Sequence, residues 1–291
     1  TFRTADLVGL DVLAHAIGTM RDKLPDDPWH ANFGVPDWLQ ALVAKGALGH
    51  KTGVGVYRKQ GRQIQVLDNG EYRDSGGEIL PGIDDILKLK NPVEKFAQLA
   101  AHPHPQAQFL WAIFRDVFHY CAYHLDGIAD NARDVDLAMR WGFGWTQGPF
   151  EIWQSAGWQD IAAMIRDDIE RGRAMSDAPL PAWVFERNGV HEAGGSYSAA
   201  RDALVPRRAL PVYQRQLYPD RVLGETADDR GETLWENAGV RLWRRADQDA
   251  RIGIVSITSK MHAIGDEVMD GMLEAVARAE RELDLTARRH Q

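Results

Sequence analysis

Several marks of secreted and membrane proteins are missing from this 291-residue sequence. Its single cysteine, Cys121, has no partner for a disulfide within the chain, so nothing points to an oxidising compartment. No apolar run approaches the roughly 18 residues that a membrane-spanning helix needs. The amino end also lacks the basic segment and apolar run of a signal peptide. We therefore expect a cytoplasmic protein that makes no membrane contact.

Basic residues are in the minority. The sequence has 42 Asp and Glu against 34 Lys and Arg, a formal net charge of -8, which disfavours binding to nucleic acid. Hydrophobic residues at 44% and charged residues at 26% are ordinary globular values, and they exclude disordered, collagen-like and coiled-coil classes. At roughly 150 residues per domain, the length is enough for two domains. We expect a folded protein without a nucleic-acid partner.

Helical periodicity dominates the sequence. Apolar residues three and four positions apart predict a helix over residues 1–24 and a long helix over about 106–127. Shorter helices are expected over 36–45, 83–89, the residues after Asp130 or Asn131, 150–170 and 264–283. The pattern predicts a mainly α fold.

Strand signals are few. Asp68-Asn69-Gly70 lies between strand-like runs and predicts a two-stranded β-hairpin within residues 63–73. Residues 240–243 and 252–257 are two further strand candidates, and a helical pattern follows them. This order of strand, strand and helix differs from everything before it, so we expect a separate domain at the carboxyl end.

An internal repeat is visible when the sequence is shifted by 148 positions, which aligns residues 1–17 with 149–165. Pro36-Asp37-Trp38 likewise resembles Pro181-Ala182-Trp183. We interpret the two stretches as copies of one structural unit. The first copy has no counterpart of residues 106–148, so we expect the sequence to begin inside a unit. The identical pairs are Phe2 and Phe150, Gly9 and Gly157, Ala14 and Ala162, and Ile17 and Ile165.

Two features at the amino end resemble reactive or binding motifs. Thr1 could act as an N-terminal nucleophile, although the incomplete repeat favours a simple chain boundary there. Residues 49–55, GHKTGVG, fail the phosphate-loop pattern G-x-x-x-x-G-K-[ST], because His50 precedes Lys51 and no strand comes before them. No G-x-G-x-x-G follows a strand at the amino end either. The favoured interpretation is a packed turn rather than a nucleotide site.

The histidines do not form a metal-binding pattern. His102 and His104 lie between prolines, with no cysteine and no third ligand at a suitable spacing. His119 and His124 are five positions apart and do not share one face of a helix. We predict surface or core histidines and no metal site.

The acidic and aromatic candidates have simpler explanations. Asp134 and Asp136 are two positions apart and so point to different sides of a helix. The positive end of the helix dipole favours an acidic side chain in the first turn, and this accounts for Asp134. The tryptophans could stack on an adenine ring, and the competing interpretation is an aromatic core or dimer face. These tryptophans are Trp141, Trp145, Trp153, Trp158 and Trp183. We therefore predict no catalytic, cofactor-binding or metal-binding residue in this chain.

Three motifs carry a resemblance to a known family: DGIADNARDVDLAM at 126–139, GFG at 142–144 and GPFE at 148–151. They resemble the helical C-terminal domain of the 3-hydroxyacyl-CoA dehydrogenases of fatty-acid β-oxidation. ADLVGLD at 5–11 and LGHKTGVGVY at 48–57 resemble the back half of the same domain. The resemblance departs at Gln154, where the first copy has Asp6, and at Trp145-Thr146-Gln147, which replaces a proline-containing turn.

A weaker resemblance concerns the carboxyl end. IGIVS at 252–256, with the helix after it, resembles the opening of a crotonase-fold enoyl-CoA hydratase. Large multifunctional β-oxidation proteins join these two enzymes. The resemblance therefore implies tandem helical units with a small β-hairpin, plus a short incomplete α/β crotonase-like start.

The resemblance divides the chain into five segments. It implies the second half of a first helical unit at 1–60, a hairpin and linker at 61–92, and a second helical unit at 93–200. A linker at 201–235 and the beginning of a crotonase-like domain at 236–291 follow.

The family's reaction implies a function for a longer parent protein. The parent would oxidise 3-hydroxyacyl-CoA to 3-ketoacyl-CoA by hydride transfer to NAD, with a histidine base oriented by a glutamate. That pair and the NAD-binding domain would precede Thr1, so we expect this chain to be inactive alone and to hold no cofactor. It would supply helical packing, part of the acyl-CoA cleft and a homodimer contact. The alternative is a non-catalytic helical interaction or scaffold module.

Overall fold

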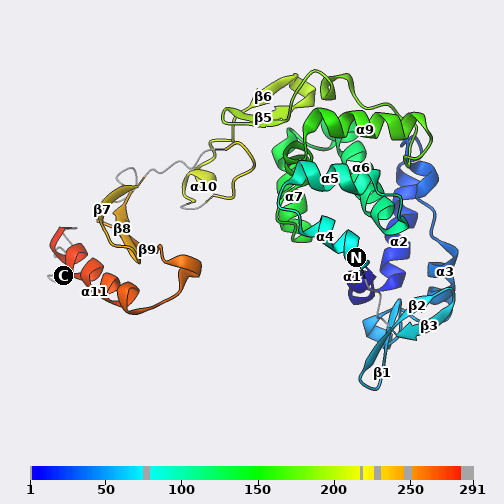
Figure 1. Cartoon of the computed structure of the whole chain (residues 1–291), viewed down its shortest axis with the longest axis horizontal. Helices are drawn as coiled ribbons and strands as arrows, with labels where there is room; N and C mark the ends of the chain where they lie inside the picture. The colour runs from blue at the N-terminus through cyan, green and yellow to red at the C-terminus, as the bar shows by residue number, and fades with distance from the viewer. Residues whose placement is uncertain (1, 75–78, 217–218, 226–230, 246–250, 283–291) are drawn as a thin grey trace. The chain divides into compact units, whose positions relative to one another are not determined.

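The computed structural model describes residues 2–74, 79–216, 219–225, 231–245 and 251–282. The chain forms two compact units, Thr1–Glu225 and Thr226–Gln291 (Figure 1). Helices account for most of the regular structure, and the strands form small sheets of three. The five predicted segments are finer than these two units and stay a prediction.

The first unit begins with two short helices where the sequence predicts one. Helix α1 spans Phe2–Val8 and helix α2 spans Leu10–Lys23. Gly9 between them has a φ of 116°, a conformation that no helix contains and that glycine adopts most readily. The prediction of one helix over 1–24 was therefore wrong at this residue. Apolar periodicity continues through the break because Leu10 and the residues after it still face one core.

A three-stranded sheet follows helix α3 (Asp37–Ala44). Strands β1 (Tyr57–Gln60), β2 (Gln63–Asp68) and β3 (Glu71–Asp74) are antiparallel, in the order β1-β2-β3. The predicted hairpin at Asn69-Gly70 is confirmed: both residues have positive φ, as a two-residue hairpin turn requires. The predicted two strands were one too few, because β1 pairs with the other edge of β2.

Helices form the larger part of the first unit. Helix α6 lies among the others in Figure 1 and supplies Trp111, Phe118 and Leu125 to their shared core. Asn91 and Asn131 cap α5 and α7 through their side chains. Helix α5 has no counterpart among the helices that the sequence predicts. The helices are α4 (Pro81–Lys88), α5 (Pro92–Ala101), α6 (Pro105–Ile128), α7 (Ala132–Phe143), α8 (Pro149–Ser155) and α9 (Trp158–Glu170).

A second small sheet follows α9. Strands β4 (His191–Glu192), β5 (Gly195–Ser198) and β6 (Ala203–Val205) are antiparallel, in the order β4-β5-β6. Strand β6 lies in the range predicted as a linker, and the short helix α10 (Pro211–Gln214) follows it. Strands of two to four residues are too short to show the alternation by which a sequence announces a strand.

Two parts of the first unit contain related elements. Helices α1 and α2 precede the sheet β1-β2-β3, and α8 and α9 precede the sheet β4-β5-β6, but helix α3 lies between the helix pair and the sheet only in the first part. Gly9 and Gly157, which are 148 positions apart, both have positive φ and both precede the second helix of the pair. The backbone thus follows the sequence similarity at these positions.

Trp29 joins the amino-terminal part to α6. Its ring is buried and contacts His119, Tyr120 and Tyr123 with centroid distances of 4.7, 5.0 and 5.5 Å. The Asn32 side chain adds a hydrogen bond of 2.9 Å to the carbonyl of residue 175. These contacts make residues 1–60 and the α6 region parts of one unit.

The second unit is a sheet covered by one helix. Strands β7 (Glu232–Glu236), β8 (Val240–Arg244) and β9 (Gly253–Ile257) are antiparallel, and helix α11 spans Asp266–Glu282. Val240, Leu242 and Val268 are buried between sheet and helix. The two predicted strands and the helix are confirmed, and β7 is an additional strand in the predicted linker. In the described ranges, no helix has the length and apolarity needed to cross a membrane.

Candidate functional site

A buried chain of polar side chains links α7 to the sheet β4-β5-β6. The Asp136 carboxylate lies 2.7 Å from Nε2 of His191, whose Nδ1 lies 2.9 Å from Oγ of Ser196. Asp136 and Ser196 have no exposed surface and His191 has 2%. The side chains are those of a serine nucleophile with its base, but the serine oxygen has no access to solvent. The arrangement therefore stabilises the core rather than performing nucleophilic catalysis.

Asp136 also caps helix α8. Its two carboxylate oxygens accept hydrogen bonds from the backbone amides of Phe150, at 2.8 Å, and Glu151, at 3.0 Å. Burial raises the pKa of Asp136 above its usual 3.8, against the lowering effect of the His191 and amide hydrogen bonds. Gly148 makes the approach possible, because a Cβ there would lie 2.3 Å from Cα of Asp136. The GPFE motif thus begins with a residue at which no side chain fits.

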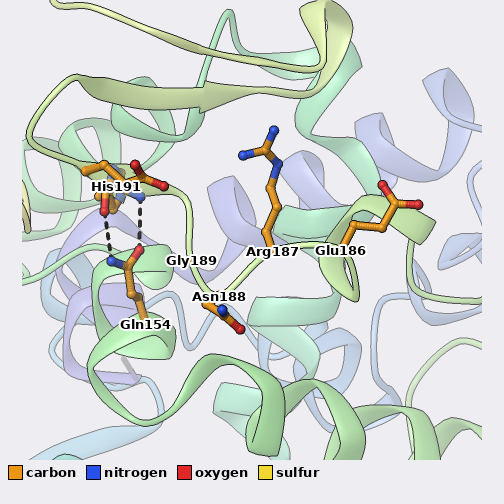
Figure 2. A pocket seen from close by; sticks show the side chains of 7 residues that line it. Gln154, Glu186, Arg187, Asn188, Gly189 and His191 are labelled. Atoms are coloured by element: carbon orange, nitrogen blue, oxygen red, sulfur yellow. Dashed lines mark hydrogen bonds between the residues drawn. The ribbon is translucent and has the colours of Figure 1, made fainter.

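Gln154 holds the start of the second sheet. Its Oε1 accepts the amides of Val190 and His191 at 2.8 and 3.0 Å, and its Nε2 donates to the His191 carbonyl at 2.9 Å. Figure 2 shows the two bonds to His191 beside an open pocket of about 410 Å³. The pocket is lined by Gln154, Glu186, Arg187, Asn188, Gly189, His191 and Glu192.

The pocket is lined by acidic and basic side chains rather than by a catalytic group. In Figure 2 the Arg187 side chain extends away from Gln154. Its guanidinium lies 4.0 Å from the centre of the Tyr197 ring and 3.7 Å from Asp202. Glu186 adds a carboxylate at the rim. The Gln154 side chain is engaged by backbone groups, so the pocket holds no nucleophile and base that face it together.

A second buried polar cluster joins α6 to α9. Arg115 bonds to Asp116 at 2.8 Å and to Asp168 at 3.1 Å, and its side chain is 7% exposed. Trp111 Nε1 donates to the same Asp168 oxygen at 2.8 Å. Arg173 also pairs with Asp168. Two arginines and two aspartates largely compensate each other's charge, as a structural network requires.

The loop at 49–55 is a packed turn. Asp6, which matches Gln154 in the repeat, accepts the amides of Val56 and Tyr57 at 2.8 and 2.7 Å. Gly55 lies against this carboxylate, and a Cβ there would be 2.2 Å from Asp6 Oδ1. Within the loop itself, the amides of residues 49, 52, 53 and 55 donate to nearby backbone carbonyls and are therefore not free to bind a phosphate. Lys51 forms an exposed ion pair with Asp11.

The remaining sequence candidates fall into the core or at helix ends. His104 accepts the amide of Gln106 and so caps α6, and His102 accepts the amide of His104. His119 is buried with its Nε2 2.8 Å from the Ala178 carbonyl, and burial lowers its pKa below the usual 6.5. Cys121 is buried as well, which raises the pKa of its thiol to about 12 and leaves it unreactive near neutral pH. Thr1 lies outside the described residues.

The tryptophans divide between core and surface. Trp153 and Trp158 are buried and stacked, with ring centroids 4.2 Å apart, and Trp183 lies 6.0 Å from Trp158. Trp145 contacts the Phe114 ring at 6.4 Å. Trp141 is 64% exposed, and its Nε1 donates to a carboxylate at residue 220. Three of the five tryptophans thus belong to one aromatic cluster.

No metal centre is formed by the described residues, since they contain no suitably placed group of three His, Cys, Asp or Glu side chains. The polar residues of these clusters that sequence reasoning did not propose for a site are the buried His191 and Ser196 and the half-buried Gln154. A signal for Gln154 existed, because the repeat aligns it with Asp6 in the ADLVGLD motif. No sequence pattern connects Ser196 to Asp136.

Comparison with known proteins finds a family match at the amino end. Residues 1–59 match the C-terminal domain of 3-hydroxyacyl-CoA dehydrogenase. A Bacillus subtilis (strain 168) protein named probable 3-hydroxyacyl-CoA dehydrogenase is 32% identical over 97% of this chain and 34% of its own length. A Deinococcus radiodurans protein of the same name is 42% identical over 20% of this chain and 16% of its own length.

A relative of different name extends over the same range. The putative fatty acid oxidation complex trifunctional enzyme of Rickettsia felis is 24% identical over 97% of this chain and 34% of its own length. No solved structure matches the chain. The chain spans about a third of the length of its Bacillus and Rickettsia felis relatives. It is similar to 3-hydroxyacyl-CoA dehydrogenases along nearly all of its residues.

Proposed function

We propose that this chain supplies the helical part of a 3-hydroxyacyl-CoA dehydrogenase, which oxidises a 3-hydroxyacyl-CoA to a 3-ketoacyl-CoA with NAD. The observation that carries the proposal is the similarity to the Bacillus protein over 97% of the chain, together with the family match at residues 1–59. In this role the chain packs against the acyl-CoA cleft and contributes a dimer contact.

The polar clusters support a structural role of this kind. Asp136, Gln154 and Asp168 each bind backbone or side chains of a neighbouring element, and the burial of Ser196 keeps its hydroxyl from a substrate. The catalytic histidine–glutamate pair and the NAD site then belong to another part of the enzyme. Each buried cluster holds one helix in place against another.

The second unit has a proposed role of its own. We propose that residues 236–291 begin an enoyl-CoA hydratase domain of the crotonase type. A three-stranded sheet covered by α11, in a unit separate from the helical one, supports this assignment. The name of the Rickettsia felis relative, a trifunctional fatty acid oxidation enzyme, fits a protein that joins several activities.

A segment exchange tests the dehydrogenase proposal. The matched segment of the Bacillus protein is replaced by this chain, and NADH oxidation with acetoacetyl-CoA is followed by absorbance. We expect the hybrid to keep dehydrogenase activity, because the helical part supplies packing that related sequences share. A hybrid that folds, by circular dichroism and size, but lacks activity would favour the alternative of a scaffold module.

The chain alone provides the matched control. With acetoacetyl-CoA and NADH it should show no turnover, since the reacting groups lie elsewhere. Turnover comparable to that of the complete Bacillus protein would contradict the proposal that this chain carries no catalytic residue.

A further inference from the structure

The first unit contains two apolar cores that share no side chain. In residues 2–74, which we call the amino-terminal lobe, Leu10, Leu39 and Val56 are buried together. The core of the following helices is formed by side chains between residues 96 and 204. The lobe is therefore held to α6 by contacts outside both cores.

These contacts come from one turn of the lobe, residues 27–32. In the described part of the chain, the hydrogen bonds, ion pairs and ring contacts between the lobe and residues 79–216 all come from Asp27, Trp29 and Asn32. The Trp29 indole lies among four rings of α6, with centroid distances from 4.7 to 5.7 Å. We call the turn and these four rings, His119, Tyr120, Tyr123 and His124, the joint.

The joint buries polar ring atoms without satisfying them. Nε1 of Trp29, Nδ1 of His119 and Nε2 of His124 are buried and have no hydrogen-bond partner among the described residues. A buried polar group without a partner disfavours the closed state, because water would satisfy it in an open one. The closed joint is therefore weaker than its ring contacts alone would make it.

The hydrogen bond of His119 determines which of its nitrogens can gain a proton. Nε2 lies 2.8 Å from the Ala178 carbonyl, which can only accept, so Nε2 carries the hydrogen of the neutral imidazole. A proton gained in acid must go to the buried Nδ1. The Trp29 indole N–H beside it is a donor and cannot accept from it. Within the described residues, a protonated His119 thus has no acceptor for Nδ1 while the joint is closed.

The charges around His119 partly oppose one another. Burial is the largest influence and lowers the pKa of His119 below its usual 6.5. The Ala178 hydrogen bond and Asp116 raise this pKa, and Arg115 and His124 lower it. Asp116 pairs with Arg115 at 2.8 Å, so its charge is largely compensated. The surroundings therefore favour a neutral His119.

The second histidine of the joint acts in the opposite direction. Nε2 of His124 lies 3.1 Å from Oδ2 of Asp27, so a protonated His124 attracts the turn. The Asp27 carboxylate also accepts the amide of Trp29 at 2.7 Å and a hydrogen bond from Tyr120. The His124 side chain is 20% exposed, and an ion pair that is open to water contributes little. A charge on the fully buried His119 has the larger effect.

We propose that the joint is a pH-sensitive switch, in which protonation of Nδ1 of His119 displaces Trp29 and releases the amino-terminal lobe from α6. In the open state, water reaches the buried ring nitrogens of the joint. The lobe keeps its fold, because its core contains no side chain from α6. The inference concerns a conformational change and does not depend on the reaction proposed above.

Amide hydrogen exchange of the full chain measures the opening. The amides of Trp29, His30 and Asn32 donate within the turn, so their exchange reports its release. In the open state His119 titrates near the usual 6.5, so the opening equilibrium should rise severalfold from pH 7.5 to 5.5, to a limit of about tenfold. The comparison is made after correction for the intrinsic exchange rate. Amides of α2 and α9 should keep their protection.

Two matched variants assign the effect to one histidine. His119→Gln can still donate to the Ala178 carbonyl but cannot be protonated, so the corrected exchange of the turn should no longer depend on pH. His124→Gln removes the other imidazole and its attraction to Asp27, so it should keep the pH dependence or make it steeper. The reverse pattern would assign the pH dependence to the ion pair and overturn the proposal.

Three further results would also overturn it. One is a turn whose corrected exchange does not accelerate at pH 5.5 in a folded parent chain. Another is a pH dependence that His119→Gln retains. The third is an equal acceleration in α6 and α9, which would indicate unfolding of the whole unit. If His119→Gln does not fold, nitrogen NMR of His119 in the parent chain replaces it, and protonation of Nδ1 without loss of protection in the turn has the same meaning.

Discussion

Replacement of Asp136 by alanine should strongly destabilise the first unit. The carboxylate is fully buried and accepts three hydrogen bonds, from the amides of Phe150 and Glu151 and from Nε2 of His191. Alanine removes the acceptor for all three groups while they stay buried. Gly148 packs directly on this residue, so the neighbouring backbone has little room to rearrange.

The size of the effect follows from the number of groups left without a partner. A buried donor without an acceptor costs about 1–3 kcal/mol, so three of them give roughly 3–9 kcal/mol. Water that enters the space left by the carboxylate would favour the lower part of this range, and we expect about 4 kcal/mol. Whole domains are stable by only about 5–15 kcal/mol, so the variant should be close to unfolding.

Urea denaturation followed by circular dichroism measures this loss as a lower midpoint at an unchanged slope. Asp134→Ala is the matched control, because Asp134 lies on the same helix and bonds to one side chain, that of Asn131. Asp134→Ala should lower the free energy of unfolding by no more than about 1 kcal/mol. Equal effects of the two substitutions would refute the assignment of Asp136 as the residue that holds α7, α8 and β4 together.

Three further predictions concern the packing of single residues. Gly55→Ala should lower the free energy of unfolding by about 1–3 kcal/mol, because the new Cβ would lie 2.2 Å from Oδ1 of Asp6 and 2.6 Å from Cα of Gly49. Gly18→Ala is the opposite case: the new Cβ would meet no atom within 4 Å, and the substitution should stabilise α2 by about 1 kcal/mol. Arg115→Leu should lower the free energy of unfolding by about 3–5 kcal/mol, since it leaves the buried Asp116 without its cation and the buried Asp168 with Arg173 alone. Burial lowers the pKa of His119, so its contribution to stability is present above the usual 6.5 and is lost as pH falls through the lowered pKa. His119→Gln, which can still donate to the Ala178 carbonyl, should therefore reduce the loss of stability between pH 7.5 and acidic pH.

A specific result would contradict each of these predictions. Urea midpoints that move in the same direction for both glycine variants would contradict the close approach at Gly55. A free energy of unfolding for Arg115→Leu within about 0.5 kcal/mol of the parent value would mean that the network contributes no more than an exposed ion pair. Parallel pH–stability curves for the parent and His119→Gln would show that another group causes the acid sensitivity.

Local structure in this protein follows from local sequence. Apolar periodicity identified the long helix around residues 106–127, and Asn69-Gly70 identified the hairpin, because both signals act between residues close in the chain. Gly9 shows the limit of periodicity, since the apolar pattern runs through a residue whose φ breaks the helix. The strands β4 to β6 were missed because each has no more than four residues.

The buried polar chain could not be predicted in the same way. Asp136 and His191 are 55 positions apart, and Ser196 joins them from the next strand. The motif around Asp136 is recognisable in the sequence, but the spacing of its residues does not predict which histidine forms a hydrogen bond with Asp136. The same holds for Arg115 and Asp168, which meet only because α6 crosses α9.

The sequence by itself determined the helical character and the similarity to dehydrogenases, because these depend on residue order and on contacts within a few positions. The tertiary structure decided which polar side chains are buried together and which apolar ones are left exposed. Phe2 and Phe150 are the same residue type, each at the start of a short helix, yet one is half exposed and the other is fully covered. The difference lies in α6 and α7, which cover one pair of helices and not the other, and burial of this kind is a property of neighbours in space.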